Sequence, residues 1–257
     1  MTEWSIAEAA RVLLAAEDAG TTRGPITGEW PDLDVPTAYA VQDEALRLRL
    51  ARGEKLIGAK LGLTSKAKQE RMGVDRPVLA WLTDAMVSPP ADPLPELIAP
   101  RAEPEIVFVL GSRLAGPGVT AATALAAVDR VYGGIEVIDS RYHDFRFAAP
   151  DTIADNASSG VFRLGPVGVS PVGLDLTLEA CLLEVDGAIV DSATGAAVLG
   201  HPGEALALAA NSLAERGLAL EAGWIVLTGA LTDAVPISAG SRVAAHFTSL
   251  GSVTLSG

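Results

Sequence analysis

The stretch that decides the fold is "RAEPEIVFVLG", residues 101–111. Ile106 to Leu110 are apolar without a break, which is typical of a buried strand. Glu103 and Glu105 lie two positions apart, and side chains two apart on a strand point to the same face. The sequence therefore predicts two carboxylates side by side next to an apolar core, where repulsion and desolvation are costly unless something compensates them.

A second apolar strand, "GGIEVIDS" at residues 133–140, contains a third acid, Glu136. A single acid in a strand usually lies on a solvated face or pairs with a neighbouring cation, here Arg101 or Arg141. Three acids in two apolar strands instead favour a hard divalent cation, Mg²⁺ or Mn²⁺. Such an ion binds carboxylate oxygens and keeps positions open for water and substrate.

Lys60, in "IGAKLGLTS" at residues 57–65, is the second unusual residue. Its side chain either extends to the surface or, if buried, serves as a hydrogen-bond donor and tunable acid or base beside an anion. The segment alone leaves both interpretations open.

Composition limits the class of protein. The chain has 257 residues, 49% of them hydrophobic, with a net charge of −13, which predicts a globular protein and argues against nucleic acid or an anionic membrane as partners. A small anionic substrate would need a local positive charge. Cys181 is the only cysteine, so an internal disulfide and a cysteine–zinc cluster are excluded. Without a bilayer-spanning run or a basic signal-peptide region, a cytoplasmic location is expected.

The elements predict an α+β protein in two parts. Residues 1–55 form a helical N-terminal region, in which Ser5 and Glu8 have capping-box spacing. Residues 56–257 form a mixed-β catalytic domain, with a largely antiparallel β core built from short runs separated by Gly and Pro. Helices are predicted from Thr120 through "TAATALAAVDRV" and from Pro202 to Gly217.

One motif points elsewhere. "GPGVTA", residues 116–121, matches a G-x-G-x-x-A pattern ahead of a predicted helix, as in a nicotinamide-dependent oxidoreductase. However, "GSRLA" separates it from the preceding strand, and no companion βαβ unit lies upstream. The oxidoreductase is therefore only a remote alternative.

Six segments carry a family resemblance: "GAKLGLTSKAKQERMGVDRP", "AEPEI", "EVIDSRYHDF", "DTIADNASSG", "GAAVLGHPGEALALAANSLAERG" and "LTGALTDAVPI". Through these segments the chain resembles the 2-oxopent-4-enoate hydratase and 4-oxalocrotonate decarboxylase family of the fumarylacetoacetate hydrolase superfamily. The resemblance implies a mixed-β fold with a divalent metal, Mg²⁺ or Mn²⁺, at its mouth. The family's metal ligands fall on Glu103, Glu105 and Glu136, and its active-site lysine on Lys60.

The resemblance favours the decarboxylases within that family. Hydratases typically carry Asp where this chain has Val78, and "LGHP" around His201 is similar to the decarboxylases. Against this, Leu79-Ala80 replaces a usual Tyr-Gly pair, and Pro104 replaces a usual alanine. The expected reaction is decarboxylation of a 2-oxo-3-enedioate, such as 2-oxohex-3-enedioate (4-oxalocrotonate), to 2-hydroxypenta-2,4-dienoate in meta-cleavage aromatic catabolism. The hydratase of the same family is the near alternative.

Further contacts are predicted around this site. Asp155, Ser158 and Thr228 are candidate substrate contacts, each with a structural role in its loop as the alternative. Arg141 either meets the distal carboxylate or pairs with a nearby acid. The expected partners are a small anionic 2-oxo acid and other copies in a homo-oligomer, or a partner hydratase in a complex. A non-catalytic subunit of such a complex is disfavoured by the intact glutamates and Lys60.

Overall fold

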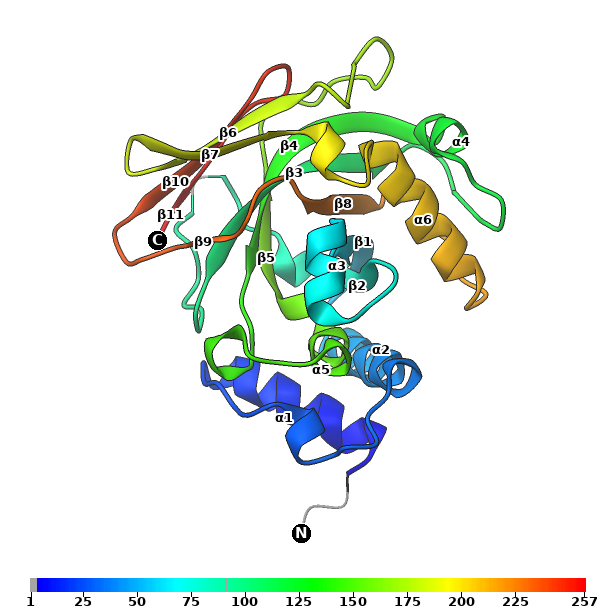
Figure 1. Cartoon of the computed structure of the whole chain (residues 1–257), viewed down its shortest axis with the longest axis vertical. Coiled ribbons are helices and arrows are strands. Elements are labelled where there is room, and N and C mark those ends of the chain that lie inside the picture. Colours follow the sequence, from blue (N-terminus) through cyan, green and yellow to red (C-terminus); the bar gives the residue numbers. More distant parts are fainter. Residues whose placement is uncertain (1–3, 91) are drawn as a thin grey trace.

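The computed structural model describes residues 4–90 and 92–257, so the helical prediction for residues 1–3 lies outside the described residues. The larger of its two sheets has the order β2-β1-β8-β3-β4-β5, with β9 paired to β3 (Figure 1). Only β1 and β8 pair in parallel; the other neighbours are antiparallel. The strands are β1 (Leu56–Gly62), β2 (Val78–Thr83), β3 (Arg101–Leu110), β4 (Val128–Ile138), β5 (Ser159–Leu164), β8 (Ile225–Ala230) and β9 (Val235–Pro236).

The smaller sheet is antiparallel throughout, in the order β11-β10-β6-β7. Its strands are β6 (Ala180–Val185), β7 (Ala188–Thr194), β10 (Arg242–Phe247) and β11 (Gly251–Ser256). It contacts the larger sheet at β4 and β5. Phe108 of β3, Leu183 of β6 and Val243 of β10 belong to one buried cluster that joins the two sheets. The predicted α+β fold with a mixed, largely antiparallel core is confirmed.

Helices lie beside the large sheet, and a group of helices lies at one end of the molecule (Figure 1). Helices α1 and α2 pack on each other, and α2 packs on α5. Ser5 caps α1 as predicted, with its Oγ 3.2 Å from the Glu8 N–H that donates to it. The helices are α1 (Ile6–Asp18), α2 (Val35–Ala51), α3 (Lys66–Met72), α4 (Ala121–Leu125), α5 (Ala149–Ala154) and α6 (Pro202–Ala214).

The N-terminal helices share a hydrophobic core with the rest of the chain. Leu13 and Val41 from these helices belong to the same buried cluster as Val78, Tyr142 and Ile153. This cluster fixes the helices against β2 and α5, next to the large sheet. The division of the chain at residue 55 stays a prediction about its organisation.

The predicted helix at Thr120 is wrong beyond its first turns. Thr120 caps α4, but this helix ends at Leu125, and the chain enters β4 at Val128. Pairing with β3 buries Val128 and Val131, so tertiary packing outweighs the local helical pattern. Because β3 and β4 are antiparallel neighbours, the "GPGVTA" segment between them is not part of a βαβ unit. Helix α6 does begin at Pro202 and ends just before Gly217, which has a φ of +70°.

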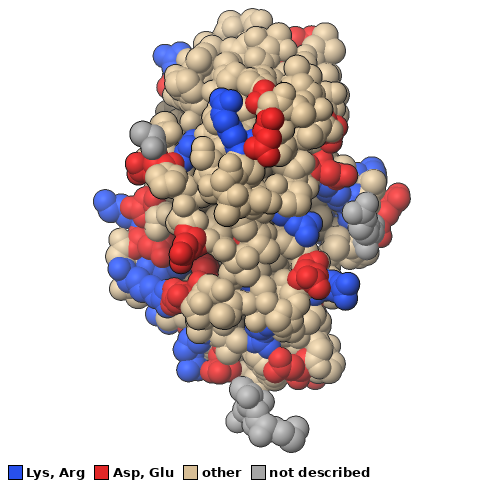
Figure 2. All heavy atoms as spheres, turned by 90° about the vertical axis from the view of Figure 1, so that its left-hand side faces the viewer, with Lys and Arg blue, Asp and Glu red and all other residues tan. Residues whose placement is uncertain are grey.

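Acidic and basic side chains are interspersed on the face shown in Figure 2, and its upper part is largely uncharged. The acidic side chains seen on this face therefore do not form a single patch. Within residues 4–90 and 92–257, no helix has the length and apolar character needed to cross a membrane.

Candidate active site

The three glutamates converge on one point of the large sheet. Glu103 of β3 lies directly opposite Glu136 of β4, and Glu105 follows on the same face of β3. One carboxylate oxygen from each lies within 4.8 Å of the others. Glu105 is 0% exposed and Glu136 is 2% exposed. Like charges directly across a strand pair repel each other, so this arrangement of the carboxylates destabilises the sheet locally.

Glu105 is held from one side only. Its Oε2 accepts a hydrogen bond from the Gly229 N–H at 2.8 Å. Gly229 has a φ of +110°, and a Cβ there would lie 2.3 Å from Thr64 Oγ1, so only glycine presents this N–H without strain. The other oxygen, Oε1, is buried and has no hydrogen-bond partner among the described residues.

Burial raises the pKa of Glu105 well above its ordinary value, and the charges of Glu136 and Glu103 raise it further. Burial also raises the pKa of Glu103, while the nearby Lys68 ammonium lowers it. A divalent cation would reverse this balance by giving the oxygens a strong positive partner. Three hard oxygen donors and an unpartnered buried oxygen are the features that such an ion requires.

Lys60 lies beside the acids on β1, which runs between β2 and β8. It is 2% exposed, so of the two predicted interpretations the structure has the buried one. Its Nζ donates to the Ala157 carbonyl at 2.7 Å and lies 3.0 Å from Oε1 of Glu136 in an ion pair. An ammonium has three N–H groups. One N–H is used by the Ala157 carbonyl and the ammonium also pairs with Glu136, so at least one donor is available to a ligand.

The Ala157 carbonyl is presented by an unusual turn. Asn156, Ala157 and Ser158 all have left-handed φ values, of 49°, 50° and 56°. Such conformations persist only where the surroundings enforce them. Here the Asn156 side chain makes hydrogen bonds of 2.9 Å to both the N–H and the carbonyl of Trp81. The turn is therefore a rigid support for the Lys60 ammonium.

A cavity of about 510 Å³ opens over Lys60, Glu103 and Ala157. Ser158 reaches it, and the buried Ser158 Oγ has no hydrogen-bond partner among the described residues. Val78 of β2 forms part of the wall beside Lys60 and carries no polar group. The lining also includes Arg101, Glu103 and Phe145.

The other predicted contacts, Arg141, Asp155 and Thr228, are not in the lining of this cavity. Arg141 and Asp155 form a buried ion pair with each other, and Arg141 Nη1 also donates to the Ser159 carbonyl at 2.9 Å. Arg141 thus adopts the second of its two predicted roles, pairing with an acid. Thr228 is fully buried and donates to the Ile106 carbonyl at 2.7 Å, so it ties β8 to β3.

Two cations of the site were not predicted as site residues. Helix α3 brings Lys68 over the sheet, with Nζ 3.5 Å from Glu103 Oε1 and 3.9 Å from Asp233 Oδ1. Arg101 lies two residues before Glu103 on the same face of β3, and its Cζ is 4.1 Å from the centre of the Phe145 ring. The two-residue spacing of Arg101, Glu103 and Glu105 could have indicated that Arg101 shares a strand face with the two glutamates.

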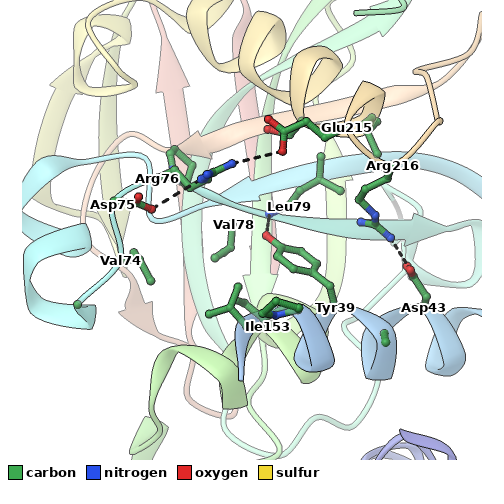
Figure 3. Close-up of a pocket in the computed structure, with 17 residues that line it drawn as sticks. Tyr39, Asp43, Val74, Asp75, Arg76, Val78, Leu79, Ile153, Glu215 and Arg216 are labelled. Atoms are coloured by element: carbon green, nitrogen blue, oxygen red, sulfur yellow. Dashed lines mark hydrogen bonds and ion pairs between the residues drawn. The ribbon is translucent and has the colours of Figure 1, made fainter. Parts of the chain in front are cut away.

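A second, larger cavity of about 840 Å³ is lined by residues of α2, α5 and α6 (Figure 3). Tyr39 of α2 and Ile153 of α5 line one side, and ion pairs of Arg76 with Glu215 and of Arg216 with Asp43 lie along it. The three glutamates and Lys60 are not in its lining. Val78 borders both cavities and lies between them.

The fold and the site together define a metal-dependent enzyme of the fumarylacetoacetate hydrolase type. The chain belongs to the 4-oxalocrotonate decarboxylase and 2-keto-4-pentenoate hydratase family within that superfamily, whose members are lyases. No family model matches the chain. Its family membership rests on relatives that it matches over most of their length.

The chain is as similar to a relative named as a decarboxylase as it is to a relative named as a hydratase. The chain is 42% identical over 231 residues to the 4-oxalocrotonate decarboxylase of Pseudomonas sp. strain CF600, covering 89% of this chain and 88% of the relative. It is 42% identical over 237 residues to the 2-hydroxyhexa-2,4-dienoate hydratase of Comamonas testosteroni, covering 90% and 89%. The crystallised 4-oxalocrotonate decarboxylase of Pseudomonas putida G7, complexed with magnesium and adipate, superposes with a TM-score of 0.96 at 38% identity, covering 100% and 98%.

Proposed function

We propose that this protein decarboxylates a 2-oxo-3-enedioate, with 2-oxohex-3-enedioate (4-oxalocrotonate) as the substrate and 2-hydroxypenta-2,4-dienoate and CO₂ as the products, in meta-cleavage aromatic catabolism. The observation that carries the choice is Val78. It lines the cavity beside Lys60, at the position where the hydratases typically have an acid. Water addition needs a group that exchanges a proton with the water, and an aliphatic side chain lacks one.

Mg²⁺, or Mn²⁺ in its place, would be held by Glu103, Glu105 and Glu136. The unpartnered Oε1 of Glu105 and the convergence of three carboxylate oxygens support this assignment. When bound there, the cation supplies a Lewis acid that lowers the energy of negative charge on a neighbouring oxygen. The magnesium and the dicarboxylate adipate in the Pseudomonas putida relative agree with such a site.

Loss of CO₂ moves one electron pair along the conjugated system. The C5–C6 bond breaks and its pair forms a C4–C5 double bond. The C3–C4 pair shifts to C2–C3, and the 2-oxo oxygen gains negative charge and then a proton. We assign to Lys60 the donor that meets this oxygen, because its ammonium is fixed by Ala157 and Glu136 and has a third N–H. Ser158 is assigned as a second polar contact of the substrate, because its buried Oγ has no protein partner among the described residues.

The hydratase on the same scaffold is the second candidate, favoured by the equal identity to a hydratase relative. A paired assay separates the two. The purified protein, supplied with Mg²⁺, should release CO₂ from 2-oxohex-3-enedioate much faster than it hydrates 2-hydroxypenta-2,4-dienoate. The opposite ratio would make it a hydratase. Added nicotinamide cofactor should change neither rate.

Assembly with other chains is a separate proposal. We propose a homo-oligomer, with a complex with a partner hydratase as the alternative. Light scattering of the protein alone, and then mixed with such a hydratase, would measure the mass of each assembly. A monomeric mass under both conditions would contradict both proposals.

A further inference from the structure

The lining of the cavity includes a cationic side chain that pairs with no acid among the described residues. The Lys60 ammonium pairs with Glu136, and the Lys68 ammonium lies near Glu103 and Asp233. The Arg101 side chain, by contrast, has neither an ion pair nor a hydrogen bond among the described residues, although it lines the same cavity. Its guanidinium therefore keeps its donors available for a ligand.

Arg101 lies at a defined distance from the acids. On β3 it follows the same two-residue spacing as the glutamates, so successive positions lie about 6.6 Å apart along the strand. The order along this face is Arg101, Glu103, Glu105. A ligand whose 2-oxo acid end lies at the glutamates would therefore extend its other end toward Arg101.

The Phe145 ring packs against the Arg101 guanidinium and leaves its N–H groups available for such a contact. With the Arg101 Cζ 4.1 Å from the ring centre, the aromatic face supports the cation without occupying its N–H groups. Those groups form a planar fork that matches the two oxygens of a carboxylate. A bidentate contact to a carboxylate is thus the chemistry that this pair of side chains suits.

We propose that Arg101, supported by Phe145, binds the distal carboxylate of the substrate and makes the site selective for 2-oxo dicarboxylates over 2-oxo monocarboxylates. This inference rests on the proposed function, and it assigns to Arg101 a role that Arg141, paired with Asp155 and absent from the cavity lining, does not take. Arg101 is a specificity residue in this assignment.

The direction of the electron flow predicts a distinctive kinetic signature. The carboxylate at Arg101 loses its negative charge as neutral CO₂ forms, so the Arg101 contact is stronger in the ground state than in the transition state. A contact of this kind improves binding without accelerating the chemical step. Loss of Arg101 should therefore raise KM for the dicarboxylate and leave kcat unchanged or higher.

A pair of unreactive ligands tests the inference on the Mg²⁺-loaded protein. 2-Oxohexanedioate has the distal carboxylate and 2-oxopentanoate lacks it, while both have the same 2-oxo acid end. Calorimetric titration would compare the natural protein with Arg101→Met, Arg101→Lys and the matched control Arg130→Met. Arg130 is an exposed β4 residue whose Nε lies 3.8 Å from its neighbour Asp129.

Arg101→Met should weaken 2-oxohexanedioate binding by about 10- to 100-fold, the usual effect of losing a hydrogen-bonded charge, and change 2-oxopentanoate binding less than about twofold. Arg101→Lys should lie between the two, and Arg130→Met should match the natural protein. An equal loss for both ligands, or no loss for either, would overturn the inference. So would a natural protein that binds the two ligands equally well, whether or not the variants fold.

The two proposals fail separately. If the natural protein hydrates 2-hydroxypenta-2,4-dienoate faster than it releases CO₂, but prefers the dicarboxylate ligand through Arg101, the proposed reaction is wrong and the carboxylate subsite stands. If it releases CO₂ and Arg101→Met leaves KM unchanged, the reaction stands and the subsite is wrong.

Discussion

The protein contains two groups of buried acids that differ in how they are compensated. Asp151 is fully buried, and its carboxylate accepts hydrogen bonds from the Thr27 N–H, the Thr27 hydroxyl and the Ala148 N–H at 2.6 to 2.9 Å. Asp139 accepts from two backbone N–H groups, at Ile98 and Ala99. In the second group, Glu105 has one backbone donor and one oxygen with no partner among the described residues.

This difference separates structural acids from functional ones. An acid whose oxygens are satisfied by the chain joins distant segments, as Asp151 joins the N-terminal region to α5. An acid without enough donors destabilises the fold unless a ligand compensates it. Packing elsewhere in the chain offsets that cost, and the three carboxylates are left in an arrangement that could hold a metal ion. The comparison predicts opposite responses to removing a charge from the two groups.

The largest expected effect is on activity, in Glu105→Gln. The amide keeps the shape and removes one of three negative charges, so Mg²⁺ affinity and kcat should both fall. We expect a loss of at least about 10³-fold in kcat, because the cation contributes several kcal/mol of transition-state stabilisation. The free energy of unfolding without metal should be unchanged or higher, since a repulsive buried charge is gone.

Urea unfolding and a metal titration measure the two effects of Glu105→Gln independently. The matched control is Asp151→Asn, which should lose about 1 to 3 kcal/mol of stability, because donors at Thr27 and Ala148 lose a charged acceptor. The kcat of the folded control should stay normal. Activity that survives both Glu105→Gln and exhaustive chelation would contradict the metal assignment.

The second largest effect on activity is expected for Lys60, the cation that lies beside the three glutamates. Lys60→Met keeps most of the length and removes the donor. We expect kcat to fall by on the order of 10²–10³, with little change in KM, because the contact forms mainly in the transition state. Metal affinity should be retained, since the three glutamates are untouched. Near-normal kcat with a raised KM would mean that Lys60 only holds an anionic substrate.

The convergence of the three glutamates could be predicted from the sequence because its signals are local. The spacing of Glu103 and Glu105 within an apolar run fixes their shared face, and Glu136 repeats the pattern in the strand that pairs with them. Lys60 was ambiguous from the sequence, because its burial depends on strands β2 and β8 that come from distant segments.

The remaining roles depend on contacts that no local pattern encodes. Arg141 and Asp155 are 14 residues apart, and the long connection between β4 and β5, which contains α5, brings them together inside the protein. The sequence does not show that the Arg101 guanidinium lacks an ion pair among the described residues, because this depends on where the acids around the cavity lie in the fold. The sequence likewise predicted a long helix at Thr120, because the pairing that turns Val128 into a strand residue is with β3, earlier in the chain.

The smallest effect on chemistry, and the one that tests the structural group most sharply, is expected for Arg141→Met. Removing one partner of a buried ion pair leaves an uncompensated charge and typically costs about 3 to 5 kcal/mol. Urea unfolding should show that loss, whereas the exposed control Arg130→Met should change stability by less than about 0.5 kcal/mol. Lost activity at normal stability would instead support the first alternative, in which Arg141 meets the substrate.

The loss in Arg141→Met should also depend on pH. Burial raises the pKa of Asp155 to about 6, although the charge of Arg141 lowers it. A carboxyl with a higher pKa in the folded than in the unfolded chain stabilises the fold at low pH, and this contribution is lost as pH rises through the folded-state pKa. Without Arg141 the folded-state pKa rises further, so the variant continues to lose stability above pH 6, where the natural protein no longer does. The stability difference between the two should therefore be larger at pH 8 than at pH 6, and an equal difference at both values would show that Asp155 does not titrate in this range.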